Sequence, residues 1–301
     1  MATLRETKDR IASVRSTLKI TSAMKLVASS KLRKAQNAIE ALRPYEAELQ
    51  KILQASMSAA SRRQEGAPDL VSRLLGLQDE SSERGEESCS RPIVAVVAIS
   101  SNTSLCGGFN ANVIRQVTAL LPELGETEVF SLGRKMADAM KKAGYESPAN
   151  YNGLVDHTSY ADVQELAERL VKAYLDGRYS KVILVHNHFV STSRQTVVAQ
   201  TYLPFEVSAT ASGALSADSG YYLMEPDADT IVQTLLPKVV TLKLYAALLD
   251  SIAAEHAART VAMQVATDNG EELLEQLTLE YNKERQRKIT GEILELEGGS
   301  Q

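Results

Sequence analysis

The segment SLCGGFN at residues 104–110 combines a cysteine with two glycines, residue types that can serve as a nucleophile or bind a phosphate. It follows an apolar run and precedes a helical pattern, the usual location of phosphate-binding loops in α/β proteins. It matches neither G-x-G-x-x-G nor G-x-x-x-x-G-K-S/T, and no lysine or acidic ribose partner follows at a suitable distance. Spacing gives Cys106 no His/Asp pair that would activate a nucleophile. We therefore predict a tight structural turn at Gly107 and Gly108.

Two of the four histidines, His186 and His188, lie on one face of a predicted strand and could begin a metal site. No third ligand is evident, so we interpret the pair as structural. The two cysteines, Cys89 and Cys106, match neither a disulfide framework nor a CxxC metal site, which is typical of a reducing compartment. These patterns favour structural roles for the turn, the histidines and the cysteines over catalytic, cofactor-binding or metal-binding ones.

Positive charge is concentrated near the N-terminus. Residues 1–63 hold thirteen Lys and Arg against five Asp and Glu, a net charge of +8 in a chain of net charge −5. Such a segment can face nucleic acid, anionic lipid or an acidic protein surface. It lacks the interleaved aromatic residues of many nucleic-acid-binding surfaces, and aromatic residues make up only 5% of the chain.

We predict a long helix at each end of the chain. Over residues 1–60 a Thr3/Glu6 capping box precedes a heptad pattern, with Pro44 predicted to kink or end the helix. Residues 238–296 contain no proline and repeat the pattern; as a helix they span about 88 Å, against about 35 Å for a 120-residue domain. The C-terminal helix, within a segment 238–301, must therefore project beyond any globular domain.

We expect the two helices to pair as an antiparallel coiled coil. Matching the polar exceptions places Thr21 opposite Arg259 and Lys25 opposite His256, although a slip of seven residues preserves the apolar pattern. In this register residues 278–297 form a tip with no partner in the chain. An isolated helix in water is not expected to expose as much apolar surface as this tip has, so another protein should surround it. The apolar residues of the tip are Leu279, Ile289, Ile293, Leu294 and Leu296.

The middle of the chain predicts a small Rossmann-like α/β domain at 92–210. An acidic linker at 61–91 precedes it and a connection at 211–237 follows it. We expect a mostly parallel sheet with an antiparallel edge, built from strands at 93–100, 128–132, 181–189 and 196–205 and helices at 112–121, 135–143 and 160–175. The longest apolar run, 93–99, is far below the about 20 residues that span a bilayer, and we predict no transmembrane segment.

Four segments carry a family resemblance. KITSAMKLVASSKLRKAQ at 19–36, LCGGFN at 105–110, EHAARTVAMQVATDN at 255–269 and YNKERQRKITGEILE at 281–295 closely resemble the γ subunit of the rotary (F-type) ATP synthase, in the same order along the chain. The resemblance implies a non-catalytic central shaft inside a sleeve of α and β subunits. Its α/β domain would contact the ε subunit and the membrane ring of c subunits.

In this family interpretation, a ring driven by protons or sodium ions turns the shaft, and the shaft cycles the catalytic β subunits. The chain would be a peripheral protein on the cytoplasmic face of a bacterial inner membrane, without a cofactor. Six residues match family positions that are implicated in contact with β or in coupling; for Arg259 and the tip, packing within the shaft is the other implied role. The six are Met24, Lys25, Arg259, Arg285, Gln286 and Thr290.

Two features depart from the family pattern, and two other interpretations stay open. Asn102-Thr103-Ser104 stands where many members have Asp-Arg-Gly, and the chloroplast-type cysteine insertion that confers thiol regulation has no counterpart. The alternatives are a free-standing α/β enzyme with coiled-coil arms and a site at Gly107-Gly108, and a basic coiled-coil nucleic-acid binder.

Overall fold

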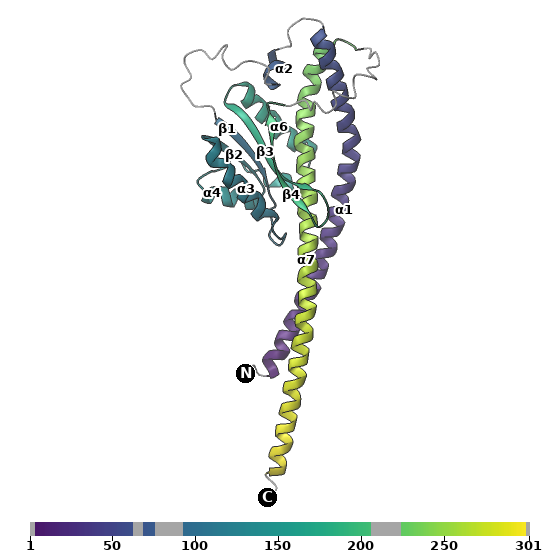
Figure 1. Cartoon of the computed structure of the whole chain (residues 1–301), viewed down its shortest axis with the longest axis vertical. Helices are drawn as coiled ribbons and strands as arrows, with labels where there is room; N and C mark the ends of the chain where they lie inside the picture. Colours follow the sequence, from purple (N-terminus) through teal and green to yellow (C-terminus); the bar gives the residue numbers. More distant parts are fainter. Residues whose placement is uncertain (1–3, 63–68, 76–92, 206–223, 299–301) are drawn as a thin grey trace.

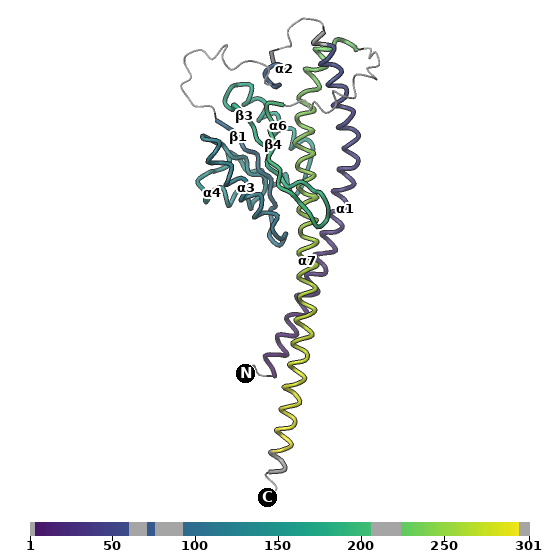
Figure 2. The backbone as a smooth tube through the Cα atoms, in the orientation of Figure 1, coloured from purple at the N-terminus to yellow at the C-terminus, as the bar shows by residue number. Residues whose placement is uncertain are grey.

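The computed structural model is a long two-helix shaft with an α/β domain attached along one part of it (Figure 1). It describes residues 4–62, 69–75, 93–205 and 224–298. Helix α1 (Leu4–Arg62) and helix α7 (Ala228–Gly298) run antiparallel, and α7 continues past the N-terminal end of α1 (Figure 2). The predicted coiled coil is confirmed.

The domain contains a four-stranded sheet in the order β2-β1-β3-β4. Its strands are β1 (Ile93–Ile99), β2 (Thr127–Leu132), β3 (Tyr179–Phe189) and β4 (Gln195–Leu203). Strand β1 pairs in parallel with β2 and β3, while β3 pairs antiparallel with β4. The predicted mostly parallel sheet with an antiparallel edge is therefore confirmed.

Helices cover both faces of the sheet, because alternate residues of β1 are apolar on both sides. Helix α3 (Phe109–Leu124) and helix α4 (Arg134–Lys142) pack on the face that includes Val96 and Ala98. The other face, with Ala95 and Val97, packs against α6 (Tyr160–Leu175) and the upper part of α7. A short helix, α5 (Gly153–Asp156), precedes α6.

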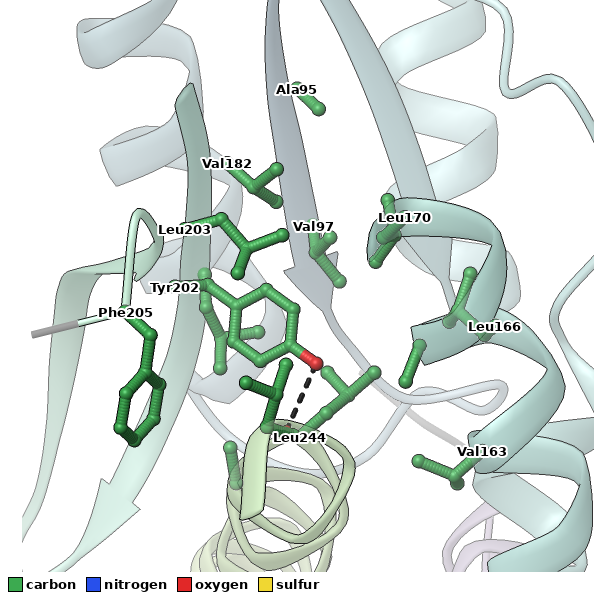
Figure 3. Packing of buried hydrophobic residues seen from close by; sticks show 14 of the residues in the cluster. Ala95, Val97, Val163, Leu166, Leu170, Val182, Tyr202, Leu203, Phe205 and Leu244 are labelled. Carbon is green, nitrogen blue, oxygen red and sulfur yellow. Dashed lines mark hydrogen bonds between the residues drawn. The ribbon is translucent and has the colours of Figure 1, made fainter. Parts of the chain in front are cut away.

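The core on the Ala95 and Val97 face of the sheet fixes the domain to the shaft. Tyr202 of β4 is fully buried, and its hydroxyl donates a hydrogen bond of 3.0 Å to the Val240 carbonyl of α7 (Figure 3). Leu203 and Leu244 pack around it. Helix α7 thus belongs to both the domain core and the coiled coil.

Several predicted boundaries were wrong. Helix α1 does not end at Pro44, which was one of the two outcomes expected there, and α7 begins at Ala228 and continues through Pro237, inside the expected connection. Within the expected acidic linker, α2 (Asp69–Leu74) buries Val71 and Leu74 in the domain core, because these two side chains supply an apolar face. Thr3, Cys89, most of the expected linker and residues 211–223 of the expected connection lie outside the described residues.

Helix α7 also contains an 18-residue window apolar enough to cross a membrane by length and composition. Half of that window is buried within the fold. Its apolar side chains include Leu236, Val240, Leu244 and Leu248, which are fully buried in the domain core. A buried core helix passes the same test, so packing accounts for this window.

The predicted coiled-coil register was wrong by about one heptad. The Thr267 hydroxyl of α7 donates to the Thr21 hydroxyl at 3.1 Å, and Lys25 Nζ donates to Gln264 Oε1 at 2.7 Å. Gly270 lies against Leu18. Sliding by seven residues keeps apolar residues on the seam, and the observed register brings the hydroxyls of Thr21 and Thr267 together.

Candidate functional site

The first part of the candidate site is the contact between the α/β domain and α7. Arg259 is buried there and its guanidinium donates to the Ser104 carbonyl at 2.6 Å, the Thr103 hydroxyl at 2.8 Å and Glu255 Oε1 at 2.5 Å. We call Arg259, Glu255, Thr103 and Ser104 the Arg259 cluster. Burial raises the pKa of Glu255 above its usual range, although Arg259 opposes the rise.

The Gly-Gly turn lies directly on α7 at this cluster. Gly107 has a φ of +57°, and a Cβ at this position would lie 3.8 Å from Ala262 Cβ. Cys106 and Phe109 are buried against Ala254 of the same helix. The turn thus packs against the shaft, an arrangement that gives no support to a phosphate site or to an enzyme built on Gly107-Gly108.

Side-chain amides hold the loop after β1 in place. Asn110 Oδ1 accepts a hydrogen bond of 3.0 Å from the Ser101 amide. Asn102 donates to Asp156 at 2.7 Å and accepts from the Arg134 amide at 2.9 Å. Within this loop, Thr103 and Ser104 bind Arg259 through neutral oxygen atoms.

The second contact between domain and shaft involves the histidine pair. His188 Nδ1 lies 2.6 Å from Asp250 Oδ2, and His186 Nε2 lies 3.6 Å from the same oxygen. The Phe189 amide donates to Asp250 Oδ1 at 3.1 Å. We call Asp250, His186, His188 and the Phe189 amide the Asp250 cluster. Within the described ranges, no group of His, Cys, Asp and Glu has the arrangement of a metal site.

The structure separates the predicted site residues into three places. Arg259 is buried at the domain contact, whereas Lys25 and the half-buried Met24 lie midway along the shaft. Arg285, Gln286 and Thr290 are exposed near the end of α7, about 32 Å along the axis from the level of Lys25. The Thr290 hydroxyl donates to the Gln286 carbonyl at 2.9 Å, within its own helix.

The unpaired tip is shorter than predicted. The Thr7 hydroxyl donates to Glu284 Oε2 at 3.3 Å, so α1 and α7 remain in contact seven residues beyond the expected end at Leu277. Among the described residues, α7 therefore extends alone from Arg285. The register shift explains this difference, because it moves every partner of α1 about one heptad toward the C-terminus.

The sequence patterns did not lead us to expect an exposed apolar band near Lys25. Leu26 is 68% exposed and Val27 is 57% exposed, and Val261 and Val265 are exposed at the same level of α7. These residues lie off the heptad seam. Their sequence signal was available: apolar side chains at coiled-coil positions that should face solvent indicate a further contact surface.

His256 lies within the shaft and is held neutral. Burial is the largest cause that lowers the pKa of His256 to about 4, and the positive charges of Lys31 and Arg259 lower it further. The expected partner, Lys25, contacts Gln264 instead.

Comparisons with known proteins place this architecture in a family. A sequence model described as ATP synthase matches residues 3–301. The chain is 45% identical to the ATP synthase gamma chain of Phocaeicola vulgatus, with 100% of this chain and 99% of the relative covered. It is 39% identical to that of Flavobacterium johnsoniae, with the same coverage.

Solved structures show the same fold. The central stalk of the Tetrahymena thermophila mitochondrial ATP synthase matches with a TM-score of 0.54 and 23% identity, covering 82% of this chain and 99% of that one. The rotor of the Euglena gracilis enzyme matches with a TM-score of 0.57 and 19% identity, covering 95% and 98%. With its two-helix shaft, its attached α/β domain and full-length relatives, the chain belongs to the ATP synthase gamma chain family.

Proposed function

We propose that this chain is the rotating central shaft of an ATP synthase. The ion-driven ring of c subunits turns the shaft, and the asymmetric shaft changes the affinities of the three catalytic β subunits for ADP, phosphate and ATP. In reverse, ATP hydrolysis turns the shaft and pumps ions. The observation that carries the proposal is the lone end of α7, which exposes Ile289, Ile293 and Leu294 where α1 gives no cover.

The partner contacts follow from the positions of the exposed residues. Met24 and Lys25, together with the apolar band at Leu26 and Val27, face the β subunit's acidic loop. Arg285, Gln286 and Thr290 contact β near the C-terminal end of α7, where guanidinium and amide groups can bind carboxylates and backbone carbonyls. Arg259 acts at a distance from β, by fixing the loop after β1 to α7.

The α/β domain contacts the ε subunit and the membrane ring. The chain carries no catalytic residue of its own, since the chemistry belongs to the β subunit. Its place is the cytoplasmic face of a bacterial inner membrane, as a peripheral subunit. Support comes from the family membership and from the packing of the Gly107 turn against Ala262.

The apolar band offers a direct test in the assembled enzyme. Replacing Leu26 and Val27 by Asp places two charges on a surface that the sleeve would bury, so ATP-driven ion pumping should fall relative to ATP hydrolysis. The replacement Asn37→Asp, at an exposed position of the same helix, is the matched control. Unchanged pumping per ATP hydrolysed in a folded, assembled double variant would contradict this contact.

A further inference from the structure

The Asp250 carboxylate uses both of its oxygens to hold the end of β3. Oδ2 faces the two histidines, and Oδ1 accepts the Phe189 amide at 3.1 Å. The Asp250 side chain is only 16% exposed. Burial acts to raise its pKa, but the hydrogen bonds from His186, His188 and the Phe189 amide outweigh burial and lower the pKa of Asp250. Asp250 is thus an ionised hydrogen-bond acceptor that holds the end of β3.

The Phe189 ring lies between the domain and both helices of the shaft. On one side it packs against a cluster that contains Leu32 and Ala35 of α1 and Ala253 and Ala257 of α7. On another side it packs against the cluster of Cys106, Phe109 and Ala254. The carboxylate that fixes the Phe189 amide therefore also sets where this ring enters the coiled coil.

The Asp250 and Arg259 clusters hold α7 from different sides. Nine residues separate Asp250 from Arg259, which is about 13.5 Å along the axis and two and a half turns of helix. Their side chains therefore leave α7 on roughly opposite faces. One reaches the end of β3, and the other reaches the loop after β1. Together with the core around Tyr202, contacts on two faces of α7 oppose a pivot of the domain about the helix.

We propose that Asp250, with His186 and His188, is a positioning residue for torque transfer. The Asp250 cluster fixes the α/β domain against rotation about α7, so that a turn of the domain reaches the coiled coil without angular slip. This inference depends on the proposed shaft function, in which the ring drives the α/β domain.

The test measures the torsional stiffness of the rotor in single complexes. The α and β subunits are fixed to a surface, and a bead is attached to the α/β domain at a cysteine introduced on the exposed face of α4. Asp250→Ala should lower the stiffness by less than two-fold, because the Asp250 contacts are lost while the Arg259 cluster and the Tyr202–Val240 hydrogen bond remain. Asp250→Asn retains an acceptor for the Phe189 amide and should give an intermediate value.

Two further variants keep the test decisive. Asp138→Ala removes a carboxylate from an exposed position of the same domain and should leave the stiffness unchanged. If Asp250→Ala fails to assemble, His188→Ala replaces it. His188 is 47% exposed, so its truncation removes the 2.6 Å contact with little loss of packing. ATP hydrolysis by the α, β and γ subcomplex should stay at the wild-type rate in every variant.

The outcomes separate the two proposals. Wild-type stiffness in an assembled Asp250→Ala complex, or in His188→Ala when Asp250→Ala does not assemble, would overturn the role of the Asp250 cluster. A wild-type bead that never rotates during ATP hydrolysis would overturn the shaft function itself. Lower stiffness in Asp250→Ala together with normal stiffness in Asp138→Ala would support the inference.

Discussion

Gly270 of α7 lies so close to Leu18 of α1 that a Cβ at position 270 would come within 2.7 Å of Leu18 Cδ2. The two helices approach closely at this level. The contact also shows why a glycine persists inside a 71-residue helix, where glycine otherwise costs about 1 kcal/mol relative to alanine.

Substitutions at Gly270 should therefore separate helix propensity from packing. Gly270→Ala should change the free energy of unfolding by less than about 1 kcal/mol, because the propensity gain offsets the displacement of the Leu18 methyl. Gly270→Ile should destabilise by about 1–3 kcal/mol through overpacking. Gly291→Ala, where nothing lies within 4 Å, is the control and should stabilise. Urea unfolding of the full chain measures all three, and a stabilised Gly270→Ile would contradict the contact.

The register can be tested by disulfide trapping. With Cys89 and Cys106 replaced by serine, Thr21→Cys/Thr267→Cys should oxidise efficiently, because the two hydroxyl oxygens lie 3.1 Å apart. Ala35→Cys/Tyr245→Cys, which matches the register one heptad away, should remain reduced. Non-reducing electrophoresis distinguishes the two, and the reverse pattern would restore the register expected from sequence.

The Arg259 cluster should contribute strongly to stability. Arg259→Ala leaves the buried Glu255 without its guanidinium partner and should destabilise the chain by about 3 kcal/mol. Adding Glu255→Ala removes the unpaired carboxylate, so the double variant should lose less than the sum of the single variants. Denaturant unfolding of the four chains in this cycle gives the coupling energy; strict additivity would show that the pair is not coupled.

Stability should fall in mild acid because of His256. Its folded pKa is about 4, whereas an unfolded histidine titrates near pH 6.5, so the unfolded chain binds more protons between these values. The native state should lose on the order of 1 kcal/mol as pH falls through this window, after allowance for partial exposure.

Thermal unfolding at pH 7.5 and pH 5.0 measures the effect. His256→Gln should show a smaller loss between the two pH values than the wild type. Lys31→Met removes one of the charges that lower the pKa of His256 and should reduce the loss by part of that amount. Equal losses in wild type and His256→Gln would show that another group causes the acid sensitivity.

Periodicity in the sequence was sufficient for the order of the elements. The helix expected at 160–175 has the observed bounds, Tyr160–Leu175, and the mostly parallel sheet was predicted because apolar strands alternate with helices. The register was not predictable in this way, since a heptad repeat is unchanged by a slip of seven. Contacts between particular polar groups, such as Thr21 with Thr267, decided it.

The candidate site was predicted only in part. Lys25, Arg285, Gln286 and Thr290 were identified through family resemblance and lie on the shaft surface. Asp250 was missed because its partners, His186 and His188, are more than sixty residues away in the chain, and no local pattern joins them. The pairing with Asp250 also explains why two histidines on one strand face need not indicate a metal.

We propose that this chain turns as one body inside a sleeve of α and β subunits. The most direct measurement attaches a bead to the α/β domain of the wild-type chain, in complexes fixed to a surface through their β subunits, and adds ATP. The account predicts continuous rotation in one direction at a rate that follows ATP hydrolysis. Steady hydrolysis with a bead that shows only random angular motion would contradict it.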